Sequence, residues 1–215
     1  RELLDEIAAD HPGIDVVESD TADAASIERA VAEVLERHPD LDTLIAMAGI
    51  MRVEDWTTAG FLTSAEETVQ TNVLGPIRLV HALVDHLRAR PEATIMTVSS
   101  GLAFAPLQVT PTYNATKAAI HMLSESLRLQ LAGTGVSVVE LEPPAVQTDL
   151  LPGHADNESA MPLDAFVDEV MDILATQPDV TEVQVERVKF LRYGEARGDY
   201  EQVVAALNQQ DPHGK

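Results

Sequence analysis

The chain has 215 residues, a formal net charge of −22 and 45% hydrophobic residues. This length predicts one domain over residues 1–215, and the acidic surplus argues against a nucleic-acid or membrane partner because it would repel phosphates and anionic lipids. There is no cysteine for a disulfide or a thiolate metal site, and the longest apolar run, residues 44–51, is too short to cross a bilayer, so we expect a cytoplasmic protein.

The first predicted element is an amphipathic helix. Apolar residues recur on one face between residues 27 and 35, after two possible caps, Thr21 and Asp23. The pair His38-Pro39 closes the segment.

Three short apolar runs then predict strands, at residues 43–49, 93–100 and 136–144. Nearly continuous apolar strands indicate a sheet that is covered on both faces. Helical patterns over residues 64–87 and 111–131 alternate with these runs, which predicts an α/β fold with a parallel sheet. Ligands bind such sheets at the carboxyl ends of the strands, which here are Ala48-Gly49, Ser99-Ser100 and Pro143-Pro144.

Two segments have less certain patterns. Gly75-Pro76 interrupts the helix over residues 64–87, so either two helices abut there or one helix is bent. Residues 147–162 form a loop rich in Pro, Gly and Asp, and a helix over residues 163–175 and a strand over residues 182–191 follow.

Tyr113 and Lys117 lie four residues apart near the start of the predicted helix, so both polar tips can face one point. An ammonium beside a phenol favours the phenolate, which would lower the tyrosine pKa and suit acid–base catalysis. The spacing is weak evidence alone, since a half-buried tyrosine beside a solvated lysine fits it equally well.

The strand end TVSSG followed by YNATK is a rarer combination. It resembles the short-chain dehydrogenase/reductase family, and TNVLGPIRL, LIAMAGI, VESDTAD and LEPPAVQTDL match further family motifs in order. The resemblance covers residue 1 to about residue 149, and MPLDAF and VERVKFLRY look like the bacterial DltE-like branch. It implies a Rossmann-like doubly wound parallel sheet in three α/β/α layers.

The resemblance implies a catalytic set with one role for each residue. Tyr113 would exchange a proton with the substrate oxygen, Lys117 would lower the tyrosine pKa and bind the nicotinamide ribose, and Ser100 would hold the reacting oxygen. Asn72 would position a water for proton relay to Lys117. Two alternatives remain: Asn72 as a local helix irregularity, and Ser99 as the competing serine.

The same resemblance implies a nicotinamide cofactor, NADP or NAD, with NADP preferred. Asp20 would contact the adenine, and Thr148 with the backbone of residues 143–146 would hold the nicotinamide end. The full set of implied cofactor residues is Asp20, Thr21, Ala46, Ala48, Gly49, Tyr113, Lys117, Pro143, Pro144, Val146 and Thr148.

The match also departs from the family. Ala46 and Met47 replace two asparagines, and Pro144 replaces a glycine. No glycine-rich turn for the pyrophosphate occurs, so we expect a chain that lacks the family's first β-α-β unit, roughly forty residues. The strand of residues 14–19 would then lack a partner, and residues 43–49 would form an apolar sheet edge.

Two functions remain open. The first is an NAD(P)-dependent oxidoreductase that reduces a carbonyl or oxidises a secondary alcohol; the second is a non-catalytic binding or regulatory protein that has lost dinucleotide binding. The resemblance implies a homodimer or homotetramer. Residues 150–162, with apolar Leu150, Leu151 and Met161, would form a substrate lid. No metal site is expected, because the histidines lack paired ligand spacing: His11, His38, His81, His86, His121, His154 and His213.

Overall fold

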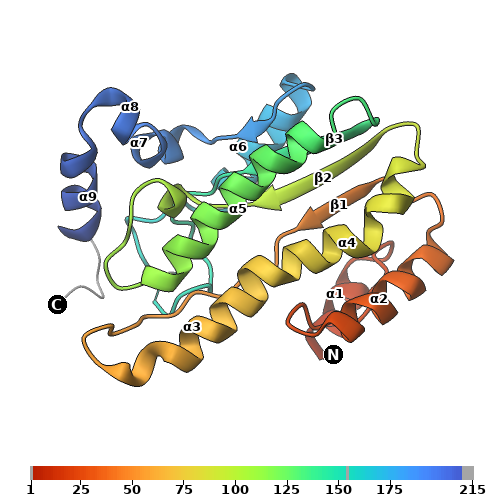
Figure 1. Cartoon of the computed structure of the whole chain (residues 1–215), viewed down its shortest axis with the longest axis horizontal. Coiled ribbons are helices and arrows are strands. Elements are labelled where there is room, and N and C mark those ends of the chain that lie inside the picture. Colours follow the sequence, from red (N-terminus) through yellow and green to blue (C-terminus); the bar gives the residue numbers. More distant parts are fainter. Residues whose placement is uncertain (1, 154, 210–215) are drawn as a thin grey trace.

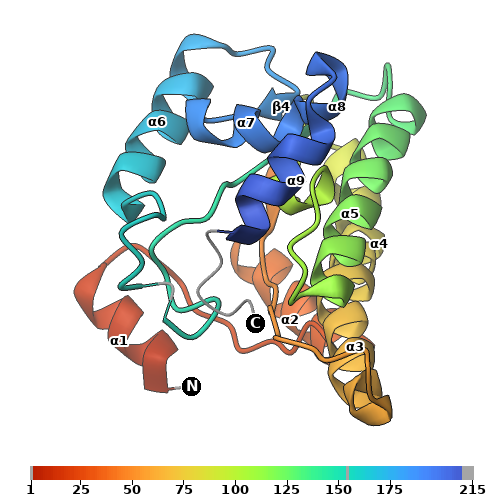
Figure 2. The ribbon, with the colours of Figure 1, turned by 90° about the vertical axis from the view of Figure 1, so that its left-hand side faces the viewer.

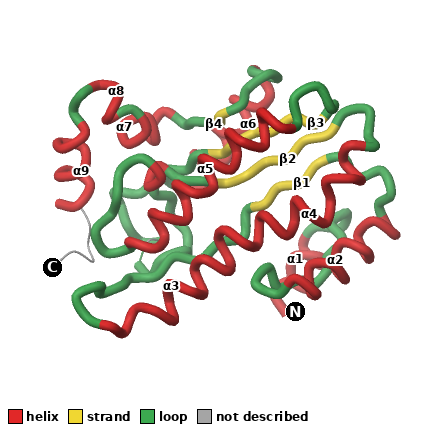
Figure 3. The backbone as a smooth tube through the Cα atoms, in the orientation of Figure 1, coloured by secondary structure: helices red, strands yellow, loops and turns green. Residues whose placement is uncertain are grey.

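The computed structural model of the chain describes residues 2–153 and 155–209. Its sheet has four parallel strands in chain order, β1 (Thr43–Ala46), β2 (Ala93–Val98), β3 (Val136–Leu141) and β4 (Glu182–Val183), as Figure 3 shows. The first three strands match the predicted runs, but each ends a few residues earlier. The residues after each strand leave the sheet at its carboxyl edge.

Helices cover both faces of the sheet, which confirms the α/β fold with a three-layer arrangement (Figures 1 and 2). One face carries α4 (Gly75–Arg88) and α5 (Pro111–Gln130), with α2 (Ala24–Arg37) packed against α4. The other face carries α6 (Leu163–Thr176). Apolar residues of β1–β3 pack under α4, and a second apolar cluster joins β2, β3 and α6. Both faces bury apolar side chains, as continuous apolar strands predict.

The interrupted helix proves to be one run with an inserted wide turn. α3 (Leu62–Val69) continues through a π-helical turn (Gln70–Leu74) directly into α4. The Gly75 amide donates to the Gln70 carbonyl, one residue further back than in an α-helix. Pro76 has no amide to donate, and the wide turn accommodates it without ending the helix. Of the two alternatives, the bent single helix is correct.

The N-terminal segment begins with α1 (Glu2–Asp10), which the pattern analysis did not predict. Residues 14–19 form no strand, and Asp23 caps α2 by accepting from the Ala25 amide. β1 is an edge strand of the sheet as described, with Ile45 and Met47 at 52% and 63% exposure. The prediction of an apolar edge at β1 is therefore confirmed.

The predicted strand over residues 182–191 is wrong beyond Val183. Val183, Val185 and Val188 are all buried, and the spacing changes from two to three after Val185. The chain accordingly turns into a 3-10 turn and short helices: Glu186–Val188, α7 (Lys189–Arg192), α8 (Gly194–Arg197) and α9 (Tyr200–Gln209). Among the described residues, no helix combines the length and apolarity needed to cross a membrane.

Candidate active site

A cavity of about 450 Å³ lies at the carboxyl edge of the sheet. Its inner wall consists of residues that follow the first three strands, including Gly49, Ser100 and Pro143. Its outer wall comes from the C-terminal part of the chain, through Phe166 of α6 and Phe190 of α7. The cavity therefore lies where parallel sheets bind ligands.

The charge of this cavity is opposite to that of the chain. Among the described residues that line it there is no carboxylate, whereas Lys117 and Arg187 are present. The whole chain carries a formal charge of −22. A ligand group that is negative, or that becomes negative during a reaction, would thus meet basic but no acidic side chains among the described lining residues.

Tyr113 enters the cavity from the first turns of α5 and is buried. Burial raises the pKa of its hydroxyl to about 12, and a hydrogen bond with Ser100 opposes this rise. Desolvation dominates because a phenolate would lose its hydration here. Tyr113 is therefore protonated at neutral pH.

Lys117 follows one turn later on the same face of α5. Its Nζ atom donates to the Val98 carbonyl oxygen at 2.8 Å and lies 5.4 Å from the centroid of the Tyr113 ring. Burial lowers the pKa of the ammonium to about 8. The causes that shift the Tyr113 pKa are burial and then Ser100, so a lowering of this pKa by Lys117 stays a prediction.

Ser100 is the N-cap of a 3-10 turn (Gly101–Ala103), where its Oγ accepts from the Leu102 amide at 3.1 Å. This cap fixes the side chain beside Tyr113. The competing serine, Ser99, also lines the cavity, and its buried Oγ has no hydrogen-bond partner among the described residues. Of the two serines, Ser100 is the one that acts to lower the Tyr113 pKa.

Asn72 lies on the π-helical turn and does not line the cavity. Its Oδ1 accepts from the Ile50 amide at 2.8 Å, and its Nδ2 donates to the Ile50 carbonyl at 2.8 Å and to the Thr116 hydroxyl at 3.2 Å. A Cβ added to Gly49 would lie 3.4 Å from Asn72 Oδ1 and 3.9 Å from Lys117 Nζ. Asn72 thus joins the segment after β1 to α5, and Gly49 lies between it and Lys117.

The expected cofactor residues divide into two groups. Gly49, Pro143, Pro144, Val146 and Thr148 line the cavity together with Tyr113 and Lys117. Four others do not line it: Asp20, Thr21, Ala46 and Ala48. The Asp20 carboxylate accepts from the Ala22 amide, and the Thr21 carbonyl accepts from Arg78 of α4.

The expected lid, residues 150–162, contributes Leu150, Asn157 and Ser159 to the lining of the cavity. Its base is tied to the segment after β3, since the Met161 amide donates to the Ala145 carbonyl at 2.8 Å. Leu150 lines the cavity, but Leu151 is 1% exposed and packs against Tyr113, and Met161 belongs to the α6 cluster. Leu151 and Met161 are core residues because their side chains point into apolar clusters. His154 of this loop, like His213, lies outside the described residues.

Sequence reasoning missed Glu54, which supports the start of α5. The N-cap residue Thr110 makes no side-chain cap. Instead a Glu54 carboxylate oxygen accepts from the Thr112 amide at 3.1 Å and from its hydroxyl at 2.7 Å. A carboxylate at a helix N-terminus accepts hydrogen bonds from free amides and interacts favourably with the positive end of the helix dipole. The sequence gives no signal of this role, because Thr110 is a residue type that often caps helices.

The fold and the cavity described above are consistent with the match of this sequence to a protein-family model. The model of the short chain dehydrogenase family matches residues 1–159. The chain belongs to the short-chain dehydrogenase family. It is 34% identical over 206 residues to the uncharacterized oxidoreductase DltE of Bacillus subtilis, covering 93% of this chain and 80% of that protein.

Solved structures of this family share its fold. A short-chain dehydrogenase from Streptomyces avermitilis matches with a TM-score of 0.76 and 23% identity, over 98% of this chain and 87% of that one. An NADPH-bound carbonyl reductase from chicken fatty liver matches with a TM-score of 0.72 and 25% identity, over 86% of this chain and 82% of that one. The first likeness concerns the fold alone.

Proposed function

We propose that this oxidoreductase reduces a carbonyl group, or oxidises a secondary alcohol, with Ser100, Tyr113 and Lys117 as its acid–base centre. The observation that carries the proposal is that these three side chains meet at one cavity whose described lining has no carboxylate. Both hydroxyl groups face this cavity, and the Leu102 amide holds Ser100 Oγ in place there. A non-catalytic binding protein would have no need of this arrangement.

We propose NADP or NAD as the cofactor, in line with the NADPH bound to the similar carbonyl reductase. The residues fit its nicotinamide end: Gly49 leaves space beside Lys117, and Pro143, Val146 and Thr148 offer an apolar wall with one hydroxyl. The bound nicotinamide supplies or accepts the hydride. The proposal concerns this end of the cofactor, since the printed sequence has no glycine-rich turn for the pyrophosphate.

The remaining steps belong to the side chains. Tyr113 holds a proton on its hydroxyl at neutral pH, because its pKa is about 12, and it can donate that proton to a carbonyl oxygen. Ser100 donates a hydrogen bond to the same oxygen. Lys117, with a pKa of about 8, is charged at neutral pH and stabilises negative charge that develops on the phenol and the substrate oxygen. Asn72 holds the Gly49 segment against α5.

The surroundings suggest further features of this function. We propose that residues 150–162 contribute Leu150 to substrate contact, and that Phe166 and Phe190 favour an apolar substrate. We also propose a single domain over residues 1–215, a homodimer or homotetramer, and a cytoplasmic location.

The experiment replaces Tyr113 by Phe in the full chain, with Tyr200→Phe on exposed α9 as the matched control. NADPH binding is followed by its fluorescence, and turnover by NADPH oxidation with a panel of aldehydes and ketones. We expect Tyr113→Phe to lower kcat by about 10²–10⁴-fold with nucleotide binding kept, and Tyr200→Phe to change neither. Full activity in Tyr113→Phe would refute the acid–base role. Absence of saturable NADPH and NADH binding to the wild type would instead support the non-catalytic alternative.

A further inference from the structure

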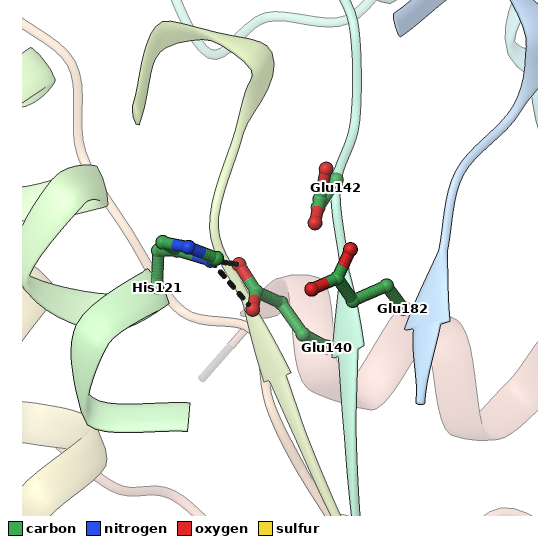
Figure 4. A group of neighbouring side chains, drawn as sticks. All are labelled: His121, Glu140, Glu142 and Glu182. Carbon is green, nitrogen blue, oxygen red and sulfur yellow. Dashed lines mark hydrogen bonds and ion pairs between the residues drawn. The ribbon is translucent and has the colours of Figure 1, made fainter. Parts of the chain in front are cut away.

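A second cluster of ionisable side chains lies on the sheet, outside the cavity lining (Figure 4). It consists of His121 of α5, Glu140 of β3, Glu142 just after β3, and Glu182 of β4. One nitrogen or oxygen from each side chain lies within 4.8 Å of every other. Figure 4 shows the four groups converging from three separate elements.

The topology explains this convergence. Glu140 and Glu142 are two residues apart along one extended segment, so their side chains leave the same face. Glu182 pairs with Glu140 in the parallel register of β3 and β4. His121 lies one turn after Lys117 on the face of α5 that meets the sheet. The cluster is therefore fixed by backbone positions rather than by flexible loops.

Two of the three carboxylates of this cluster are fully buried, and that of Glu182 is partly exposed. Glu140 and Glu142 are 0% exposed, and the His121 ring lies 3.0 and 3.1 Å from the two Glu140 oxygens through Nδ1. Neither oxygen of Glu142 has a hydrogen-bond partner of ordinary geometry among the described residues. Buried carboxylates without partners are strongly unfavourable. Glu142 therefore lies in the cluster without a hydrogen bond, with an ion pair to Arg192 as its described contact with a cation.

Arg192 of α7 provides only part of the counter-charge. Its Nε lies 3.3 Å from Glu142 Oε2, and its Nη2 lies 3.3 Å from Glu182 Oε2. One guanidinium against three carboxylates leaves two negative charges uncompensated when the imidazole is neutral. Burial, and then the carboxylates of Glu140 and Glu182, accordingly raises the pKa of Glu142 to about 8 against the opposing effect of Arg192.

We propose that His121, Glu140, Glu142 and Glu182 bind one divalent cation of the Mn²⁺ or Zn²⁺ type. Carboxylate oxygens suit Mn²⁺, and an imidazole nitrogen beside carboxylates is common for both ions. The +2 charge of the cation and the +1 charge of Arg192 together balance the three carboxylates. The cation would also link β3 and β4 to α5.

The aromatic surroundings fit this assignment. The Arg192 guanidinium lies 4.2 Å from the centroid of the Phe104 ring, and that ring meets His121 edge-on at 4.7 Å. Phe104 thus fixes the orientation of both the imidazole and the guanidinium. A held imidazole is a better metal ligand because it loses less conformational freedom on binding.

Protons are the competing counter-charge, since a protonated His121 and a protonated Glu142 would also neutralise the cluster. The experiment distinguishes a bound cation from bound protons. The full chain is treated with chelator and dialysed, Mn²⁺ is titrated into it, and free Mn²⁺ is measured by electron paramagnetic resonance. Glu142→Gln removes one ligand charge. Glu36→Gln, on the exposed face of α2, is the matched control for adventitious binding to an acidic surface.

We expect one tight Mn²⁺ per wild-type chain, at least about tenfold weaker binding in Glu142→Gln, and wild-type binding in Glu36→Gln. His121→Asn is the second variant: Co²⁺ bound to the wild type should show visible absorption bands from an imidazole-containing site, which this variant alters. Equal Mn²⁺ binding by wild type and Glu142→Gln would mean surface ions only and would overturn the proposal. Absence of tight binding to the wild type would overturn it in favour of protons.

Discussion

Tyr113, Lys117 and His121 follow one another at four-residue intervals on α5, yet they belong to two regions of opposite charge. In the cavity region, Lys117 bonds a neutral carbonyl and no carboxylate lines the described wall. In the cluster of His121, the carboxylates outnumber the cations. Both regions are buried, so burial alone does not separate them. Access to an open cavity does, because a reacting group needs space for a substrate.

The two regions are also held in different ways. Hydrogen bonds with the backbone hold the cavity residues Lys117 and Ser100: Lys117 Nζ donates to the Val98 carbonyl, and the Leu102 amide donates to Ser100 Oγ. Charge pairs hold the other region. We therefore expect substitutions in the cavity to act mainly on turnover, and substitutions in the carboxylate cluster to act on stability in a pH-dependent way.

The largest expected effect on turnover is that of a substitution at Lys117 in the cavity. Lys117→Met should lower turnover by about 10²–10⁴-fold, because it removes the positive charge beside Tyr113. Loss of the bond to Val98 costs about 1 kcal/mol, which removal of a buried ammonium offsets. Turnover with NADPH and urea unfolding of the full chain measure the two effects.

The pH dependence of the same variant supplies a control. The folded-state pKa of Lys117 is about 8, below the ordinary value of 10.5 for a lysine side chain. Between these values the folded protein has lost the proton and the unfolded chain keeps it, so the contribution of Lys117 to stability rises by about 3 kcal/mol from pH 8 to pH 10.5. This rise should be absent in Lys117→Met. An equal rise in both proteins would contradict the assignment.

A smaller effect is expected at Glu142. In metal-free protein at about pH 8, Glu142→Gln should raise the free energy of unfolding by about 1–3 kcal/mol, because it removes an unsatisfied buried charge. The folded-state pKa is raised from 4.5 to about 8, so wild-type stability falls as the pH rises through this window. The gain should therefore be small at about pH 5. Urea unfolding of both proteins at both pH values, in the presence of chelator, tests this. An equal increase in the free energy of unfolding at both pH values would contradict the charge-dependent role of Glu142.

The smallest expected effect is at Glu54. Glu54→Gln keeps the shape of the side chain but removes its charge from the N-terminus of α5, so the free energy of unfolding should fall by about 1 kcal/mol. Glu67→Gln, at an exposed position of α3, is the control and should leave stability unchanged. Chemical denaturation measures both. A loss equal to that of the control would mean that Glu54 does not support α5.

Local patterns predicted much of this fold. Apolar runs located β1 to β3, and helical spacing located α2, α5 and α6, because these elements bury one face or both. The strand beyond Val183 failed because alternation at Val183 and Val185 continues as a helical step to Val188. The sequence patterns did not predict α1. They predicted an interruption of the helix at Gly75-Pro76 but not the π-helical turn that forms there. Gly75, at the end of the π-helical turn, lies close to Thr21, and no local window of the sequence contains both residues.

Local sequence patterns also predicted only part of the candidate site. Tyr113 and Lys117 share one helix, so their spacing was informative before the structure. Glu54 lies 58 residues from Thr112, and His121 lies 19 residues from Glu140. Such pairs form only when the strand order and register bring them together. Their physical signal is a missing cap or an unpaired charge, which only the folded chain makes visible.

Because the described part of the cavity lining has no carboxylate, salt affects the arrival of an anionic ligand and its binding there differently. An anionic ligand such as a dinucleotide approaches a chain of charge −22, and long-range repulsion slows that approach. Dissolved salt screens the distant charges, over about 10 Å at 0.1 M, but acts less on Lys117 because it is buried. Added salt therefore speeds the arrival of the anion more than it weakens its hold inside the cavity.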